Sequence, residues 1–289
     1  MTNEQQKQPV TVLGLGLMGT ALAQAFRRSG HPTTTWTRSN RPGPDGTTAA
    51  ASAADAVAAS PLVVLCVLDY RAVDAVLARV PDGGLAGKTV VNLTTGTPEQ
   101  ARETSDRITG RGADYLDGGI MSNPEGVGDP TSMMLFSGSA ESYQVHHEAL
   151  SALGDARFLG WDAGLAALYD AALLGIMYSA LTGYLQAVAL VGREGVSAAG
   201  FTPMAREMLT ATSSFLGEIA GQVDSGHYAS RSARLDMQLS AAEHVIDAGR
   251  VRKVDTTVLE HVKSLMARAV ADGHAGSDYA AVIDQIRKG

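Results

Sequence analysis

One long stretch without charge limits the folds open to this chain. The segment from Gly164 to Gly192 carries no charged side chain after Asp170, and no proline interrupts it. Alanine, leucine, methionine and glutamine favour helices, so the segment is predicted to form one helix, entered through a turn at 161–164. At a rise of about 1.5 Å per residue such a helix is about 45 Å long, longer than a small domain is wide. More than one body must therefore cover it.

Small residues recur at every fourth position of this segment. They are Ala167, Ala171, Gly175, Ser179, Gly183 and Ala187. Such a row leaves a shallow groove in which a second helix can approach closely. A membrane span is the alternative, because charge-free runs of about 20 residues meet that length criterion too. The polar Thr182 and Gln186 and the lack of basic flanks favour a buried helix in a soluble assembly, and we expect no membrane contact.

The composition is that of an ordinary globular protein. A chain of 289 residues allows two domains, and the net charge of -7 argues against nucleic acid as a partner. The single cysteine, Cys66, cannot form an internal disulfide, and its apolar neighbours predict a buried strand residue. The polar start MTNEQQKQ lacks the apolar core of a signal peptide, so we expect a cytoplasmic protein.

The first half of the chain alternates short β-branched runs with helical segments. Strands are predicted at 10–13, 33–37, 62–67, 89–93, near 115, at 132–137 and at 157–159. Helices are predicted at 17–28, 48–59, 70–79, 98–109 and 141–153, which together indicate a parallel sheet covered on both faces. After the long helix only helices follow, separated near Gly226, Gly249 and Gly273. We predict a doubly wound α/β domain at 1–160, the long interdomain helix at 161–193 and an all-helical domain at 194–289.

A glycine motif follows the first predicted strand. Gly14, Gly16 and Gly19 form Gly-x-Gly-x-x-Gly between a strand and a helix, the context that dinucleotide binding requires. The first glycine makes the turn, the second admits a pyrophosphate to the backbone, and the third lets the helix sit close to the sheet. The alternative is a glycine-rich turn without a ligand.

The end of the second predicted strand indicates which cofactor binds. NAD-binding proteins usually have an acidic residue there, which would repel a 2′-phosphate, but this chain reads Thr37-Arg38-Ser39-Asn40-Arg41. Arginine can bind a phosphate as a fork, and serine can add a hydroxyl. We therefore predict NADPH as the cofactor, with the arginines selecting it over NADH; a solvated basic loop is the alternative.

Three loops are expected at the ligand-binding edge of the sheet, the carboxyl ends of its strands. They are 68–70, 92–98 and 118–130, of which the second is rich in small polar groups and the third in glycine and proline. The predicted cofactor contacts are Gly14, Leu15, Gly16, Leu17, Met18, Gly19, Thr37, Arg38, Ser39, Arg41, Val67, Leu68, Asn92 and Thr94.

With these features the chain resembles the NADPH-dependent imine reductases and reductive aminases, within the β-hydroxyacid dehydrogenase superfamily. The matching stretches run from the first strand to the last helix: VTVLGLGLMG, WTRSNR, LCVLDY, VVNLTTGTP, YLDGGIM, ALYDAALLGIMY and GHAGSDYAAVI. The resemblance implies hydride transfer from NADPH to an imine or iminium ion, with an imine, or a ketone plus an amine, as small-molecule partners.

One departure from the superfamily pattern carries chemical information. Hydroxyacid dehydrogenases that resemble this chain have a catalytic lysine, and an asparagine one turn later, on the long helix; neither residue type occurs in 164–192. Asp170 and Tyr178 are the candidate catalytic groups. An iminium carbon needs no extra proton, and a carboxylate can stabilise the cationic nitrogen or, with a pKa raised by burial, protonate a neutral imine. Imine reductases with Asp at this position lean toward R products.

The resemblance also implies a homodimer in which helical domains are exchanged. The small-residue row is what such packing needs. By this resemblance, residues 234–244 lie near the partner's active site, with Met237 and Gln238 as substrate contacts. The other predicted substrate contacts are Thr95, Met121 and Leu174. The alternative for 234–244 is a plain amphipathic helix with Met237 in the core. No metal is expected, since no metal-ligand spacing occurs. Two other functions remain open, a hydroxyacid dehydrogenase with an unusual acid and an NADPH-binding protein without turnover.

Overall fold

The computed structural model describes residues 7–39, 41–230 and 233–288 and divides the chain into two compact units, 1–176 and 177–289. The division falls within helix α6, Leu165–Gly192. Because α6 runs over this whole range without a break, the expectation of one long uninterrupted helix is confirmed. Asn40 lies outside the described residues. The domain limits 160 and 193 stay a prediction.

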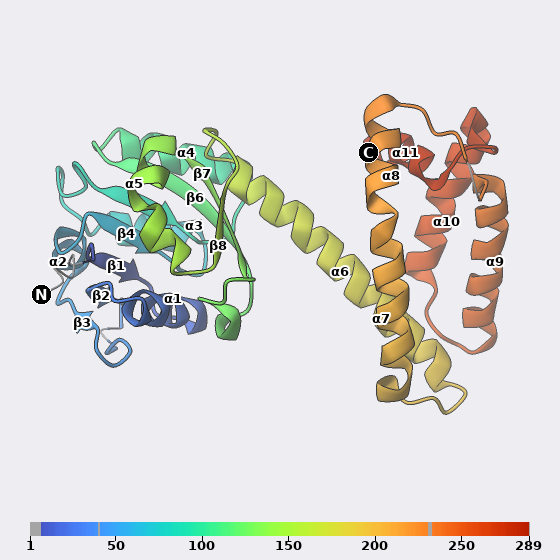
Figure 1. The fold of residues 1–289 in the computed structure, drawn as a ribbon, viewed down its shortest axis with the longest axis horizontal. Helices are drawn as coiled ribbons and strands as arrows, with labels where there is room; N and C mark the ends of the chain where they lie inside the picture. The colour runs from blue at the N-terminus through green and yellow to red at the C-terminus, as the bar shows by residue number, and fades with distance from the viewer. Residues whose placement is uncertain (1–6, 40, 231–232, 289) are drawn as a thin grey trace, which may run out of the picture. The chain divides into compact units, whose positions relative to one another are not determined.

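The first unit is an eight-stranded sheet with helices on both faces (Figure 1). The strands follow the order β3-β2-β1-β4-β5-β6-β7-β8, and every neighbouring pair is parallel except β6 and β7. Their bounds are β1 Val10–Leu13, β2 Thr33–Trp36, β3 Thr48–Ala49, β4 Leu62–Leu65, β5 Thr89–Asn92, β6 Asp114–Met121, β7 Met133–Gly138 and β8 Asp155–Phe158. The predicted doubly wound fold is confirmed, with one antiparallel pair that the expectation of a parallel sheet missed.

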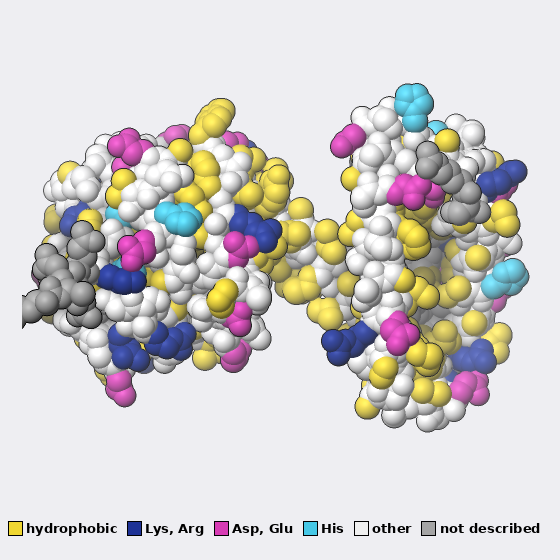
Figure 2. Space-filling model, viewed as in Figure 1, with side chains coloured by type: hydrophobic (Ala, Val, Ile, Leu, Met, Phe, Trp, Pro, Cys, Tyr) yellow, Lys and Arg dark blue, Asp and Glu magenta, His cyan; other side chains and the backbone are white. Residues whose placement is uncertain are grey.

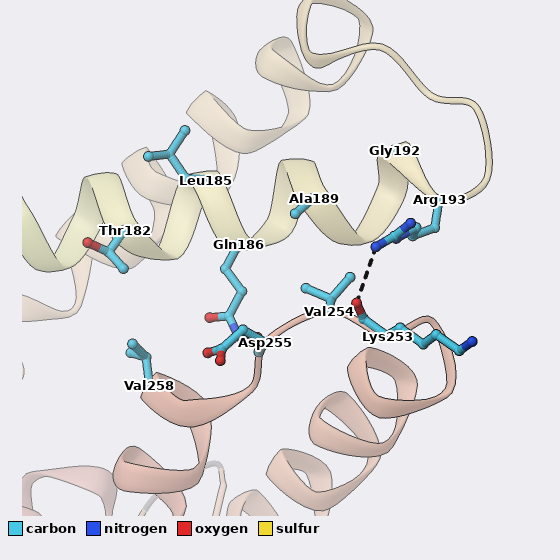
Figure 3. Close-up of a pocket in the computed structure, with 10 residues that line it drawn as sticks. All are labelled: Thr182, Leu185, Gln186, Ala189, Gly192, Arg193, Lys253, Val254, Asp255 and Val258. Carbon is cyan, nitrogen blue, oxygen red and sulfur yellow. Dashed lines mark hydrogen bonds between the residues drawn. The ribbon is translucent and has the colours of Figure 1, made fainter.

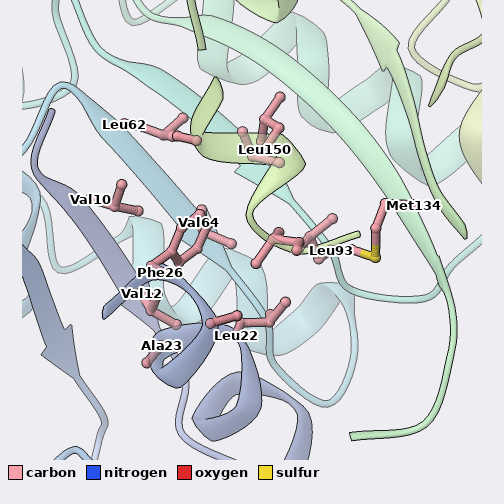
Figure 4. Packing of buried hydrophobic residues seen from close by; sticks show 14 of the residues in the cluster. Val10, Val12, Leu22, Ala23, Phe26, Leu62, Val64, Leu93, Met134 and Leu150 are labelled. Atoms are coloured by element: carbon pink, nitrogen blue, oxygen red, sulfur yellow. The ribbon is translucent and has the colours of Figure 1, made fainter. Parts of the chain in front are cut away.

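Two apolar clusters hold the helices to the two faces of this sheet. On one face, α1 and α5 pack against side chains such as Val12, Val64 and Met134, none of which is exposed (Figure 4). On the other face, α2, α3 and α4 pack against Val63, Leu65 and their neighbours. These helices are α1 Leu17–Arg28, α2 Ala53–Ala58, α3 Tyr70–Leu77, α4 Pro98–Thr109 and α5 Ala140–Ser151. Because both faces are covered, ligands can reach the strands only at their ends.

Two predicted segments need correction. The helix expected over 48–59 is a short edge strand, β3, followed by α2, which begins at Ala53 because the Ser52 hydroxyl caps it by accepting from the Asp55 N–H at 3.0 Å. The loop expected over 118–130 begins only after Met121, since the first four of those residues continue β6 and pair with β7. The rest of that segment contains a single 3₁₀ turn, η1, at Pro124–Gly126.

The start of α6 is fixed to the sheet and to α4 by polar contacts. The Ser137 hydroxyl of β7 donates to the Ala163 carbonyl at 3.0 Å and accepts from the Ala166 N–H at 2.9 Å. Asp162 accepts from Arg102 of α4 at 2.8 and 2.9 Å and from the Gly164 N–H at 2.9 Å. The first N–H groups of a helix have no partner within it, so these contacts determine where α6 begins.

The second unit contains the rest of α6 and further helices. They are α7 Ala198–Ser214, α8 Leu216–Ser225, α9 Leu235–Val251, α10 Thr257–Ala269, a π turn η2 at Val270–His274, a 3₁₀ turn η3 at Tyr279–Val282 and α11 Ile283–Arg287. Gly226 and Gly273 do break the helices, with φ of 67° and 98°. The separation expected near Gly249 is also present, since α9 ends two residues after it and α10 begins at Thr257. In the described part of the chain, α6 is the helix long and apolar enough to span a membrane by length and composition.

Candidate active site

The glycine turn after β1 has two positions required by the fold and one that faces open space. Gly14 has φ of 105°, and a Cβ there would lie 2.1 Å from the Cys66 carbonyl oxygen. A Cβ on Gly19 would lie 2.0 Å from the Gly14 carbonyl oxygen. A Cβ on Gly16 would have no neighbour within 4 Å outside its own turn. Gly16 is the N-cap of α1 and has no side chain with which to cap the helix. The helix N-terminus thus faces space in which an anion can bind.

A cavity of about 760 Å³ adjoins this turn. Twelve of the predicted cofactor contacts line it, and they are Gly14, Leu15, Gly16, Leu17, Met18, Gly19, Thr37, Arg38, Ser39, Arg41, Val67 and Leu68. The lining also includes Arg71 and Arg79, which the sequence analysis did not single out, and Asp69 is its one acid among the described residues. Four arginines against one aspartate, in a protein of net charge -7, suit a ligand with several phosphates.

The two predicted phosphate-binding arginines differ in their surroundings. Arg38 and Ser39 are exposed at the end of β2. Arg41 is exposed as well, but its Nη2 donates to the Leu15 carbonyl at 2.8 Å, so it already ties the loop after β2 to the glycine turn. Arg79 stands over the Trp36 ring at 5.9 Å. Arg38 is therefore the group better placed for a 2′-phosphate, and the residues present fit NADPH.

Asn92 and Thr94, the other two predicted cofactor contacts, are not among the residues that line this cavity, and their contact with the cofactor stays a prediction. Asn92 is fully buried, its Nδ2 donates to the Tyr115 hydroxyl at 3.2 Å, and its Oδ1 accepts from the Thr94 N–H at 3.2 Å. The Thr94 hydroxyl accepts from the Val67 N–H at 3.2 Å. Both side chains thus face the protein interior and join the loop after β5 to the loop after β4, and neither lines the cavity. Which side of β5 is turned inward could not be told from the sequence.

Asp170 is a buried carboxylate on α6. Asp170 is only 5% exposed. The helix dipole favours acids in the first turn of a helix, but Asp170 lies beyond the first turn of α6, so the dipole does not account for its position. It packs directly on β6, since a Cβ on Gly119 would lie 3.1 Å from the Asp170 Cβ and 3.3 Å from its Oδ1. Burial raises the pKa of Asp170 above its ordinary value. The carboxyl group therefore keeps its proton to a higher pH than a surface acid does.

The other predicted substrate contacts are more open. Leu174 is half-buried in the first unit, and Tyr178, which follows on α6 in the second unit, is 62% exposed. Thr95 is exposed and Met121, at the end of β6, is half-buried. Met237 of α9 is 64% exposed rather than in the core, and Gln238 donates to the Ala233 carbonyl at 2.8 Å. Their contacts with a substrate stay a prediction.

A second cavity, of about 660 Å³, lies within the second unit between α6 and the turn before α10 (Figure 3). Its polar groups are largely engaged: Gln186 donates to the Asp255 carbonyl at 2.9 Å and Arg193 to the Lys253 carbonyl at 3.2 Å. Lys253 has φ of 57°, the single non-glycine residue of the described chain in the left-handed region. Lys253 and Asp255 line this cavity, but none of the predicted cofactor contacts or catalytic groups does, so we assign it no part in the reaction.

Comparisons with known proteins identify the family of the chain. Residues 9–161 match the NAD binding domain of 6-phosphogluconate dehydrogenase, and residues 162–288 match the C-terminal domain of NADPH-dependent reductive aminase-like proteins. The chain is 38% identical over 288 residues to an NADPH-dependent reductive aminase of Aspergillus oryzae, and the match covers 97% of each chain.

Solved structures give the same result. A reductive aminase from Aspergillus terreus, in complex with NADPH4, cyclohexanone and allyl amine, is 41% identical with a TM-score of 0.91, covering 96% of this chain and 99% of its own. A Streptomyces aurantiacus imine reductase is 34% identical with a TM-score of 0.91 and the same coverage. The chain belongs to the family of NADPH-dependent reductive aminases and imine reductases.

Proposed function

We propose that this protein reduces imines or iminium ions to amines with NADPH, and that it accepts a ketone together with an amine as the source of the imine. The observation that carries the proposal is Asp170, a buried carboxylate on a helix that has no lysine or asparagine, in a chain whose sheet edge bears a dinucleotide cavity. The reductive aminase from Aspergillus terreus, solved with cyclohexanone and allyl amine, supports the ketone and amine as substrates.

Asp170 acts on nitrogen in this proposal. Bound NADPH supplies the hydride. The Asp170 carboxylate stabilises the positive charge of an iminium nitrogen, and when protonated it can instead donate its proton to a neutral imine. Burial raises the pKa of Asp170, which favours the protonated form that the second role requires. We assign Tyr178 as a second polar contact of the substrate and propose R amines as products, which chiral analysis of the product would test.

The decisive test follows NADPH consumption with a cyclic imine such as a pyrroline, and with cyclohexanone plus allyl amine. We expect turnover by the wild-type protein and a loss of about a hundredfold or more in Asp170→Asn, the range typical of a lost general acid. Asp82→Asn, in an exposed loop, is the matched control and should keep full activity. NADPH binding without consumption would favour a binding protein, and turnover of a β-hydroxyacid with NADP would favour a dehydrogenase.

We propose Arg38 as the residue that selects NADPH over NADH. Arg38→Ala should raise the NADPH Michaelis constant and leave that of NADH nearly unchanged, because only NADPH carries the 2′-phosphate. Arg41→Ala should weaken both cofactors, since Arg41 also holds the Leu15 carbonyl of the glycine turn. An equal loss of both cofactors in Arg38→Ala would contradict the assignment.

We further propose a homodimer that exchanges helical domains, in the cytoplasm and without nucleic acid or membrane. Large apolar side chains of the second unit reach the surface (Figure 2), and they include Met177, Leu181, Leu185, Met204, Met208 and Phe215, each at least 42% exposed. A patch of this kind commonly marks an interface. A second copy of the chain is the partner we commit to, because the small-residue row of α6 suits close packing with another helix.

The test measures molar mass by light scattering during size exclusion. We expect a dimer for the wild type, a monomer or a weakened dimer for Leu181→Glu, and no change for Val145→Glu, a more exposed apolar position on α5 of the first unit. A monomeric wild-type protein that sediments with lipid vesicles would instead favour the membrane interpretation of α6.

A further inference from the structure

A row of buried polar side chains crosses three strands of the sheet. Asn92 of β5 pairs with Asp117 of β6, which pairs with Ser137 of β7, and none of the three is more than 1% exposed. Their neighbours along the strands are almost all apolar. Buried polar groups destabilise a fold unless they are hydrogen-bonded, so each member of this row needs partners.

Asp117 has two tyrosine partners. Its Oδ1 accepts from the Tyr115 hydroxyl at 2.8 Å and from the Tyr70 hydroxyl at 3.0 Å. Tyr70 is the first residue of α3 and follows the cavity-lining Leu68 and Asp69. The Tyr70 ring also fills the space beside Gly96, where a Cβ would lie 2.1 Å from the ring. Through Tyr70, Asp117 therefore holds two loops at the ligand-binding edge of the sheet.

The same row reaches the start of α6. Ser137 bonds Ala163 and Ala166, and Asp170 follows Ala166 by one helical turn. Asp170 in turn packs on Gly119, which shares the face of β6 with Asp117 because side chains alternate along a strand. The ionisable groups that face Asp117 are thus Tyr70 from α3, Tyr115 from β6 and Asp170 from α6.

We propose that Asp117 is a positioning residue for the proposed reaction: held by Tyr70 and Tyr115, it fixes the loops after β4 and β5 and the site on β6 against which Asp170 packs. The inference rests on the proposed function of Asp170. The pKa of Asp117 is raised to about 7, because burial and, to a smaller extent, the charge of Asp170 outweigh the lowering effect of the two tyrosine hydroxyls. The charge of Asp170 reaches Asp117, so the two acids are coupled and a change at Asp117 is expected to act on Asp170 as well as on the shape of the site.

The test is a double-mutant cycle on kcat for imine reduction. Asp117→Asn keeps an acceptor for both tyrosines and removes the charge; we expect kcat to fall about tenfold, with folding retained by circular dichroism. In an Asp170→Asn background the same substitution should cost almost nothing, because Asp117 acts through Asp170. Thr11→Val is the matched control: Thr11 is a buried polar residue of β1, bonded to Ala56 and Ser60, and whatever effect it has should be additive with Asp170→Asn.

The pH profile gives a readout that a purely structural role would not move. The wild-type kcat should show an inflection near pH 7 that Asp117→Asn abolishes and that Tyr70→Phe shifts to higher pH, since the tyrosine hydroxyls lower the pKa of Asp117. Tyr70→Phe also decides the matter if Asp117→Asn does not fold. Wild-type kcat with an unmoved profile in these variants, or additive losses with Asp170→Asn, overturns the inference while the proposed function stands. An inactive wild-type protein overturns both.

Discussion

Replacing either of two glycines of the same turn by alanine should affect different properties, stability at Gly19 and cofactor binding at Gly16. Gly19 is buried, and an alanine Cβ there would lie 2.0 Å from the Gly14 carbonyl oxygen, a backbone atom that cannot turn aside. Gly16 is exposed, has φ of -69° and ψ of -171°, and has no atom within 4 Å of the same position. Alanine at 19 therefore strains the fold, whereas alanine at 16 meets only the space in which we expect the pyrophosphate.

The magnitudes follow from these contacts. Overpacking costs about 1–3 kcal/mol, and a backbone neighbour points to the upper end, so Gly19→Ala should lower the melting temperature by about 6–12 °C. Gly16→Ala should change the stability of the free protein by less than about 0.5 kcal/mol. Its methyl group should weaken NADPH binding about tenfold or more, which removes about 1.4 kcal/mol of ligand stabilisation.

The assay is thermal unfolding with and without saturating NADPH. Wild type should gain about 2.7 kcal/mol at a hundredfold excess over the dissociation constant. Gly19→Ala should melt early but keep this gain, and Gly16→Ala should melt normally and lose much of it. A full NADPH-induced shift in Gly16→Ala would refute the placement of the pyrophosphate at the N-terminus of α1.

Three further outcomes follow from single side chains. Asp117 has a pKa of about 7 in the folded protein and an ordinary value of 3.8, so the unfolded chain loses this proton first. The free energy of unfolding should therefore fall by about 3 kcal/mol as the pH rises from 4 to 7, and urea unfolding of Asp117→Asn should show a flatter pH dependence. Burial raises the pKa of Cys66 to about 12, so thiol reagents at pH 8 should label the native protein far more slowly than the unfolded one. Thr97→Ala removes the capping box of α4 and should cost about 1 kcal/mol in chemical unfolding, whereas an unchanged midpoint would show that this cap is dispensable.

The sequence was most informative where backbone geometry leaves few options. The glycine turn is predictable because Gly14 and Gly19 meet backbone atoms that exclude any side chain. The long helix is predictable because no proline interrupts 164–192 and Asp170 is its one charged residue. In both cases the residue type itself carries the constraint.

The remaining features depend on partners that are distant along the chain. The two-residue strand β3 exists only because it pairs with Thr34 and Thr35, so its alanine-rich surroundings suggested a helix. The antiparallel β7 depends on how the chain after Met121 turns back along β6. Asn92 and Asp117 lie within the stretches that resemble the family, but the sequence does not show that their side chains point inward. Their shared contact with Tyr115 forms only because β5 and β6 lie side by side.

The bond from Arg41 to the Leu15 carbonyl bears on how cofactor preference could change in this enzyme. A substitution of Arg41 that removes a contact with the 2′-phosphate would also release the glycine turn that we expect to bind the pyrophosphate. The resulting variant should therefore bind both NADPH and NADH poorly. Arg38 makes no such connection among the described residues, and an engineered switch should therefore begin with Arg38 and retain Arg41.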